Sequence, residues 1–112
     1  MILSNNYSEY YSNSISIHSL KKKRHSNKCL FLDRDGVFID EVFYIDSPDK
    51  VKLSENIIPF LEKIREHNFH IVILTNQSSV SRGIISFKDY QEITERILSF
   101  LSEKTYPDLI LA

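Results

Sequence analysis

The sequence predicts an α/β fold with a parallel sheet, in the order strand, helix, strand, helix, strand. Two short continuous apolar runs, Cys29–Leu32 and His70–Leu74, are typical of strands buried on both faces of a parallel sheet. Apolar residues at helical spacing follow each of them, and a third apolar run begins at Leu109. That run stops at Ala112 without a following loop, so we expect an incomplete sheet in a chain truncated at its C-terminal side.

The first helix is predicted over residues 56–67. Its apolar residues Ile57, Leu61 and Ile64 recur at helical spacing and define one face. Asn56 is a suitable N-cap, and Asn68 can take the left-handed backbone conformation that often ends a helix. We expect this helix to connect the first two strands.

The second helix is predicted to begin after Ser86, whose hydroxyl can cap it. Pro107 and Asp108 interrupt the chain before the third apolar run and end the helical pattern. The apolar face consists of residues at helical spacing, namely Tyr90, Ile93, Ile97 and Leu101.

Residues 1–28 have a different composition from the rest. The first 19 residues include six Ser, three Asn and three Tyr, without the period of a helix or a strand. We therefore expect a disordered polar and basic leader, followed by one incomplete domain over residues 29–112. The basic run "KKKRH" at residues 21–25 fits a localisation signal, an anion-binding patch or a solvated tail, of which the solvated tail is favoured.

Charge, hydropathy and cysteine content exclude several classes of protein. Residues 1–28 carry five Lys and Arg against one Glu, and residues 29–112 carry nine against fourteen Asp and Glu. An acidic domain is a poor nucleic-acid binder, and no apolar run approaches the ~20 residues that span a membrane. The single cysteine, Cys29, is expected to be a buried core residue, and it favours a reducing compartment. These features predict a cytoplasmic protein without nucleic-acid or membrane partners, and they leave its oligomeric state open.

Two polar clusters, Asp33–Gly36 and Thr75–Ser78, directly follow the first two predicted strands. The carboxyl ends of neighbouring parallel strands meet at a crevice where ligands bind. Alternation along an extended chain would point Asp33 and Asp35 the same way and turn Arg34 aside. One carboxylate could then attack a phosphorus atom while the other moves a proton, and the pair could hold Mg²⁺.

Each cluster taken alone has a simpler explanation. Asp-x-Asp-Gly also occurs in turns and in calcium loops, but a calcium loop needs further oxygen ligands where Val37 and Ile39 stand. The second cluster alone could be a polar turn at a strand end. Their occurrence together favours a shared phosphate site, to which the Thr75 hydroxyl and the adjacent backbone N–H groups are suited.

The stretches "FLDRDGV" (31–37) and "VILTNQSSVSRG" (72–83) resemble motifs of the haloacid dehalogenase superfamily of phosphatases. The resemblance is strongest to the group that contains heptose 1,7-bisphosphate 7-phosphatases and histidinol-phosphatases, and it extends over residues 28–112. It implies a Rossmann-like core and the hydrolysis of a small phosphorylated metabolite. The reaction would pass through an aspartyl-phosphate that water then hydrolyses.

The resemblance also implies a role for each motif residue. Asp33 corresponds to the nucleophile and Asp35 to the general acid and base, and both would bind Mg²⁺, Asp35 through its backbone carbonyl. Four positions of the second motif would bind the phosphate or line the substrate side, namely Thr75, Asn76, Gln77 and Arg82. Arg82 also fits an exposed loop charge.

Some features of the family are changed or absent. Ile39 and Ser79 stand where the family usually has Asn and Gly, and Glu55–Asn56 replaces Pro-Gly. The family's lysine, its second metal-binding aspartate and the Cys/His loop that holds Zn²⁺ in relatives have no counterpart up to Ala112, since Lys88 does not match the lysine motif. The third Mg²⁺ ligand and the Zn²⁺ ligands are therefore expected to be missing.

Two functions from different classes remain open. The first is a magnesium-dependent phosphatase of a small metabolite, with heptose bisphosphate as the favoured substrate and histidinol phosphate as the alternative. The second is a truncated remnant that binds phosphate or a partner without turnover.

Overall fold

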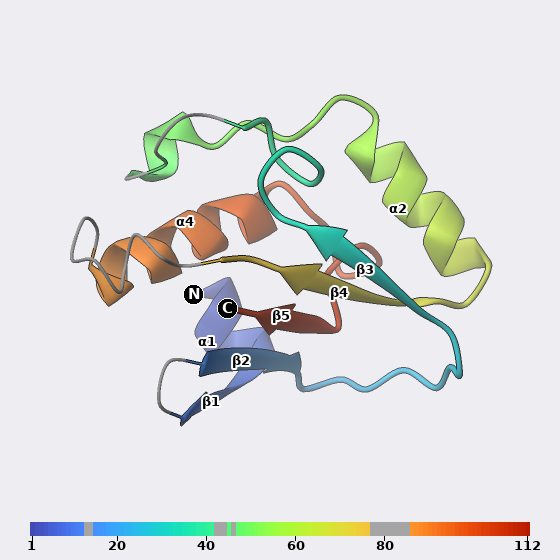
Figure 1. The fold of residues 1–112 in the computed structure, drawn as a ribbon. Coiled ribbons are helices and arrows are strands. Elements are labelled where there is room, and N and C mark those ends of the chain that lie inside the picture. The colour runs from blue at the N-terminus through green and yellow to red at the C-terminus, as the bar shows by residue number, and fades with distance from the viewer. Residues whose placement is uncertain (13–14, 42–44, 46, 77–85) are drawn as a thin grey trace.

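A computed structural model of the protein describes residues 1–12, 15–41, 45, 47–76 and 86–112. Its strands form a single sheet in the order β1-β2-β5-β4-β3 (Figure 1). None of the helices in these ranges is long and apolar enough to cross a membrane. The elements follow the chain in the order α1 (Ile2–Asn6), β1 (Tyr7–Ser12), β2 (Ile15–Leu20), β3 (Cys29–Asp33), η1 (Pro48–Lys50), α2 (Ile57–Glu66), β4 (His70–Leu74), α4 (Phe87–Ser99) and β5 (Leu109–Leu111).

The predicted strand–helix–strand–helix–strand core is confirmed. Strand β3 pairs in parallel with β4, from Cys29 opposite His70 to Asp33 opposite Leu74. Strand β4 pairs in parallel with β5, and α2 and α4 lie in the connections between these strands. The three strands form a partial Rossmann-like core within a mixed sheet, since β2 joins β5 in the antiparallel direction.

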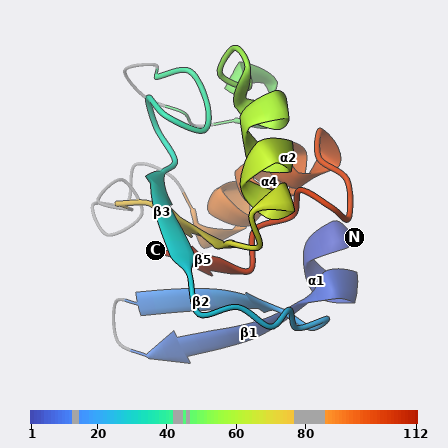
Figure 2. The same cartoon turned by 90° about the vertical axis from the view of Figure 1, so that its right-hand side faces the viewer.

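The helices of the described residues, α1, α2 and α4, lie on one face of the sheet (Figure 2). The core lies between that face and the helices, and it includes Ile57, Leu61, Ile71, Ile73, Tyr90, Ile93, Ile97, Leu98 and Ile110. The expectation that β3 is buried on both faces is wrong, because Phe31 is 59% exposed and Cys29 is also exposed. The cause is position, since β3 is the edge strand and these two residues alternate with Leu30 and Leu32, which pack toward the core. The expected burial of Cys29 fails for the same reason.

Residues 2–12 and 15–20, expected to belong to a disordered leader, instead form α1 and the two antiparallel strands of a hairpin that extend the sheet. Strands β1 and β2 pair from Tyr7 opposite Leu20 to Ser12 opposite Ile15, and β2 pairs with β5. Along β2, Ser16, His18 and Leu20 are buried while the alternate residues are more exposed. This period of two was not recognised in the sequence because the inward positions include a serine and a histidine, which are usually exposed.

Hydrogen bonds to distant segments hold the N-terminal segment in place. The Glu95 carboxylate of α4 accepts from the backbone N–H groups of Ile2 and Leu3, at 2.6 and 2.9 Å. It thereby satisfies two donors of the first turn of α1, which has no side-chain cap of its own. The Tyr7 hydroxyl, in turn, donates to the Pro107 carbonyl at 2.6 Å. These bonds explain how a short helix with little propensity is stabilised by tertiary contacts.

The predicted helix boundaries are partly confirmed. Ser86 caps α4 in a capping box with Asp89, each side chain accepting from the other residue's backbone N–H at 3.0 Å. Asn68 has φ 59°, in the left-handed region expected beyond α2. Asn56 does occupy the N-cap of α2, but it lies at φ 66° and its side chain makes no capping bond. The boundary was therefore predicted correctly, and the capping interaction was not.

His18 is a completely buried titratable residue in the hairpin. Its ring packs edge-on against Tyr11 and lies 6.5 Å from the Tyr90 ring, between centroids. Nε2 approaches Glu9 Oε1 at 3.3 Å, but neither ring nitrogen has a partner with hydrogen-bond geometry in the described chain. Burial lowers the pKa of His18 below its usual 6.5, and the nearby Glu9 carboxylate opposes this shift.

We expect His18→Phe to remove part of the acid sensitivity of folding. Because the pKa of His18 is lower in the folded chain, the unfolded chain binds more protons below about pH 6.5, and stability falls as the pH drops. The variant should lose less stability than the wild type in urea titrations between about pH 7.5 and pH 5. His67→Gln, which changes an exposed histidine, should keep the wild-type pH dependence. Equal pH slopes for His18→Phe and the wild type would contradict the assignment.

Candidate active site

The two predicted polar clusters meet at the carboxyl ends of β3 and β4. Asp33 is the last residue of β3, and Thr75 follows the end of β4. An open pocket of about 340 Å³ lies there, lined by Asp33, Leu74, Thr75, Asn76, Leu111 and Ala112. The structure therefore brings Asp33, Thr75 and Asn76 together, at the edge of the sheet where parallel α/β folds bind ligands.

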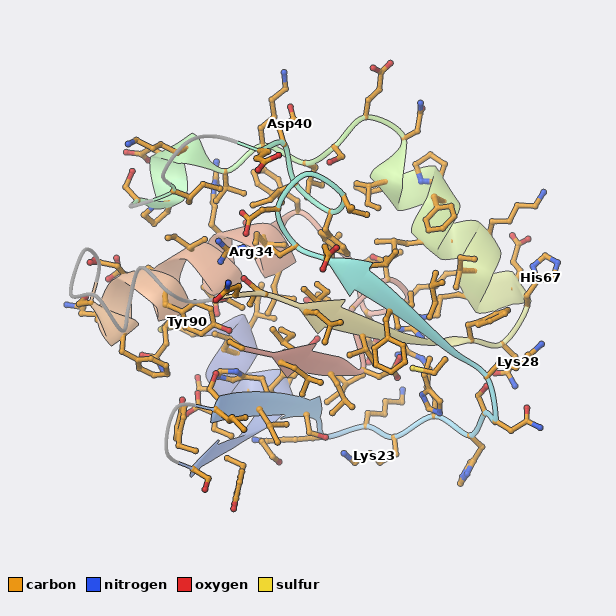
Figure 3. All side chains as sticks on the ribbon, viewed as in Figure 1. Lys23, Lys28, Arg34, Asp40, His67 and Tyr90 are labelled. Carbon is orange, nitrogen blue, oxygen red and sulfur yellow. The ribbon has the colours of Figure 1, made fainter. Side chains whose placement is uncertain are left out.

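The first motif alternates as the sequence predicts. Asp33 and Asp35 are exposed, whereas Arg34 between them is only 7% exposed. Figure 3 shows Arg34 at the start of the loop that follows β3, well separated from Asp40 further along that loop. Two carboxylates are thus open to solvent on either side of a buried cation.

The loop after β3 is fixed by its apolar residues. Phe38 and Ile39 are completely buried, and the Ile39 N–H donates to the Arg34 carbonyl at 2.9 Å. Gly36 has φ 83°, and a Cβ atom built there would lie 3.3 Å from Glu41 Oε2. Glycine is therefore favoured at this turn both by conformation and by space. Ile39, which departs from the family pattern, anchors the loop in the core.

Arg34 holds one of the two carboxylates in place. Its Nε and Nη2 atoms donate to Asp35 Oδ1 at 3.4 and 3.2 Å. Its Nη1 atom is buried without a partner among the residues that the structure describes. From the sequence we predicted only that Arg34 points away from Asp33 and Asp35, so this contact was missed. An arginine between two aspartates was nevertheless a signal for it. Arg34 is therefore a candidate positioning residue for Asp35.

We expect Arg34→Met to lower phosphatase turnover while leaving the unfolding free energy nearly unchanged. Burying a guanidinium with an unpaired donor is costly, so an apolar side chain of similar length should change the unfolding free energy by less than about 1 kcal/mol. Loss of both bonds to Asp35 should lower any phosphatase turnover about ten- to a hundredfold. Urea unfolding and a phosphate-release assay measure the two effects, and Arg34→Lys should recover part of the rate. Unchanged turnover in Arg34→Met would exclude the positioning role.

The second cluster is only partly described. The Thr75 N–H donates to the Leu111 carbonyl at 2.9 Å, so this amide holds β4 against β5. Asn76 is exposed at the pocket. Gln77 and Arg82, the other two predicted substrate residues, lie outside the described residues.

The donors at the pocket fit part of a magnesium site. Asp33 presents an exposed carboxylate at the pocket, and Asp35, which does not line the pocket, presents another in the loop after β3. Carboxylate oxygens are the ligand type that Mg²⁺ prefers. Nowhere in the described ranges do three His, Cys, Asp or Glu side chains gather closely enough to hold a metal ion. Further oxygen ligands would have to come from water, from substrate or from another segment.

Comparison with known sequences identifies the family. The family described as polynucleotide kinase 3 phosphatase matches residues 28–112, which is more than half of the chain. The chain belongs to this phosphatase family. Membership confirms the resemblance to the haloacid dehalogenase superfamily and the fold predicted from it.

Two curated relatives of this chain carry different names. The D-glycero-alpha-D-manno-heptose-1,7-bisphosphate 7-phosphatase of Photorhabdus laumondii is 40% identical over 77 residues, which cover 69% of this chain and 42% of that protein. The histidine biosynthesis bifunctional protein HisB of Legionella pneumophila is 33% identical over 79 residues, covering 69% of this chain and 22% of that protein. This chain therefore spans less than half the length of these two relatives.

Solved phosphatase structures share the fold. A HAD-like phosphatase from Mesorhizobium loti superposes with a TM-score of 0.79 at 26% identity, covering 88% of this chain and 48% of that one. This share exceeds residues 28–112, so part of the N-terminal segment is included in the match. The D,D-heptose 1,7-bisphosphate phosphatase of B. bronchiseptica, complexed with magnesium and phosphate, gives a TM-score of 0.69 at 25% identity over 74% of this chain and 48% of that one.

Proposed function

We propose that the chain carries the nucleophile-bearing part of a magnesium-dependent phosphatase that acts on a small phosphorylated metabolite in the cytoplasm. The observation that carries the proposal is the shared pocket of Asp33, Thr75 and Asn76 at the carboxyl ends of β3 and β4. Membership of a phosphatase family supports the choice of reaction.

In the proposed mechanism, an Asp33 carboxylate oxygen attacks the phosphorus atom of the substrate. The bond from phosphorus to the leaving oxygen breaks, and Asp35 gives that oxygen a proton. Water then hydrolyses the aspartyl-phosphate, with Asp35 taking back a proton. Because Oδ1 of Asp35 accepts both bonds from Arg34, Oδ2 would be the oxygen that carries the proton.

The other site residues would bind the phosphate. The Thr75 hydroxyl would hold the transferred group, and Asn76, Gln77 and Arg82 would line the substrate side. Bound Mg²⁺, held by Asp33 and by the backbone carbonyl of Asp35, would offset the repulsion between the anionic nucleophile and the phosphate. The Zn²⁺ loop remains an expectation about relatives and has no part in this proposal.

The favoured substrate is D-glycero-D-manno-heptose 1,7-bisphosphate, with removal of the 7-phosphate. Its support is the 40% identity to the Photorhabdus phosphatase that is named for this reaction. Histidinol phosphate is the alternative substrate, supported by the lower identity to HisB. The second function, from a different class, is a protein that binds phosphate at the same pocket without turnover.

A phosphate-release assay of the purified chain distinguishes these possibilities. We expect release from heptose bisphosphate in the presence of Mg²⁺, and little release from histidinol phosphate or after chelation of the metal. Faster release from histidinol phosphate would reverse the choice of substrate. Absence of turnover on both substrates, together with phosphate-induced NMR shifts at Asp33 and Thr75, would instead establish the remnant.

A further inference from the structure

A second, larger pocket lies at the opposite end of the sheet from Asp33. It has a volume of about 530 Å³, within the range of small-molecule sites. Figure 3 shows one of its residues, Lys23, far from Arg34 and Asp40, on the segment that leaves β2. The lining consists of Asn5, Asn6, Leu20, Lys21, Lys22, Lys23, Arg24, Glu103, Lys104 and Tyr106.

Positive charge dominates this basic pocket. Five of the lining side chains are cationic and only one, Glu103, is anionic. Among the residues that the structure describes, Lys21 and Lys23 donate only to the neutral oxygens of the Ser4 carbonyl and the Ser19 hydroxyl. In the described part of the chain, no carboxylate lies within ion-pair distance of Lys104. Three positive charges around the pocket are therefore left without compensation.

The remaining two cations differ in what binds them. Lys22 lies 3.6 Å from Glu103, but both side chains are more than three-quarters exposed, so this pair contributes little. Arg24 makes an ion pair with Asp108 at 3.2 Å and donates to the Glu103 carbonyl at 2.7 Å. Arg24 thus has a structural partner, whereas the ammonium group of Lys22 can turn to a ligand.

The basic run is held in place by backbone bonds, unlike a solvated tail. The Leu20 N–H donates to the Asp108 carbonyl at 2.9 Å, and the Lys21 N–H donates to the Asn6 carbonyl at 2.8 Å. Leu20 is buried and anchors the start of the run in the core. The bonds of Arg24 fix the run again three residues later, so Lys21, Lys22 and Lys23 are held at the pocket from both sides.

We propose that the basic pocket binds a small anion with three or more negative charges, of the linear polyphosphate or multiply phosphorylated class. Four ammonium groups without strong partners match such a charge, and a single phosphate group would leave most of them unpaired. Among the other lining residues, the Asn5 side-chain amide offers a neutral donor and Tyr106 an aromatic ring, whereas Asn6 Nδ2 already donates to the Ile2 carbonyl at 3.1 Å. The site is separate from the proposed catalytic pocket and does not depend on the proposed function.

Isothermal titration with inorganic triphosphate, in low salt and without Mg²⁺, tests the proposal. We expect one site per chain, with Lys22→Gln and Lys104→Gln each weakening binding about tenfold, since each removes one charged hydrogen bond. Lys104 contributes to the fold through its backbone carbonyl, which accepts from Arg65 at 3.0 Å, so its side chain can be changed without loss of that bond. Raising the salt to about 0.15 M should weaken binding further.

Matched controls give the experiment its specificity. Lys88→Gln removes the same charge from an exposed position on α4, outside the pocket lining, and should bind as the wild type does. Asp33→Asn should also leave binding unchanged, which separates this site from the catalytic pocket. Three results would each overturn the proposal. These are equal weakening of binding by Lys88→Gln, no binding of triphosphate at low salt, and orthophosphate binding as tight as that of triphosphate.

Discussion

Replacing Asp33 with asparagine is expected to abolish phosphatase turnover, with a loss of at least about 10⁴-fold. An amide cannot attack phosphorus as a carboxylate does, so the covalent intermediate should not form. Because the Asp33 side chain is exposed at the end of β3, the unfolding free energy should change by less than about 0.5 kcal/mol. Phosphate release measures the first effect, and intact-mass detection of an acid-trapped phosphoprotein shows whether the intermediate forms.

Asp40→Asn provides the matched control for this experiment. Asp40 belongs to the segment that follows β3, but its carboxylate lies 3.9 Å from Lys52 Nζ and does not line the pocket. It should keep wild-type turnover and wild-type phosphoprotein formation. If Asp33→Asn still released phosphate at the wild-type rate, Asp33 could not be the nucleophile.

The fold of residues 57–76 and 86–112 was readily predicted, because local patterns and tertiary structure agree there. The apolar run His70–Leu74 became the most buried strand, and the residues of α4 at helical spacing entered the core. Burial of β3 was not predictable in the same way. The composition of a strand does not show whether another strand pairs with each of its edges or whether helices cover both of its faces. Both depend on the position of the strand in the sheet.

The candidate site could likewise be predicted only in part from the sequence. The placement of Asp33 and Thr75 followed from topology, since both residues come directly after adjacent parallel strands. The contact between Arg34 and Asp35 depends on a side-chain direction fixed by the loop that Phe38 and Ile39 anchor. Such contacts depend on long-range packing, which residue spacing does not encode.

The hairpin was missed for a related reason. Its polar composition suggested disorder, yet two of its buried polar residues, Ser16 and His18, face the core. Their burial depends on β5, which lies some ninety residues further along the chain. The sequence of either segment alone does not show which distant strand it pairs with.

Among the charged side chains, Asp108 is the one whose replacement we expect to destabilise the fold most. It was predicted only to help end the helical pattern, but its Oδ2 atom accepts from Arg65 Nη1 at 2.7 Å and from the Ile71 N–H at 2.8 Å. Oδ1 lies 3.2 Å from Arg24 Nη1 and 3.4 Å from His70 Nδ1. One carboxylate therefore joins α2, β4 and the basic segment before β3 at the start of β5.

Asp108→Asn should lower the unfolding free energy by about 3 kcal/mol or more. The Arg65 side chain is only 5% exposed, so removing the charge of its partner leaves a buried cation without compensation. A loss of this size is a large fraction of the stability of a small domain. Urea or thermal unfolding measures it, and Asp49→Asn, at an exposed position in η1, should stay within about 0.5 kcal/mol of the wild type.

Acid should reduce the difference between Asp108→Asn and the wild type. Burial raises the pKa of Asp108, but hydrogen bonds from the Ile71 N–H and Arg65 outweigh it and hold that pKa below its usual value. The folded chain therefore keeps this carboxylate ionised longer than the unfolded chain does, so the wild type loses the contribution of Asp108 as the pH falls below about 4. Asp108→Asn has no such carboxylate to protonate, so the two stabilities should converge there. A difference that stays constant down to low pH would mean that the effect of the substitution comes from packing instead of charge.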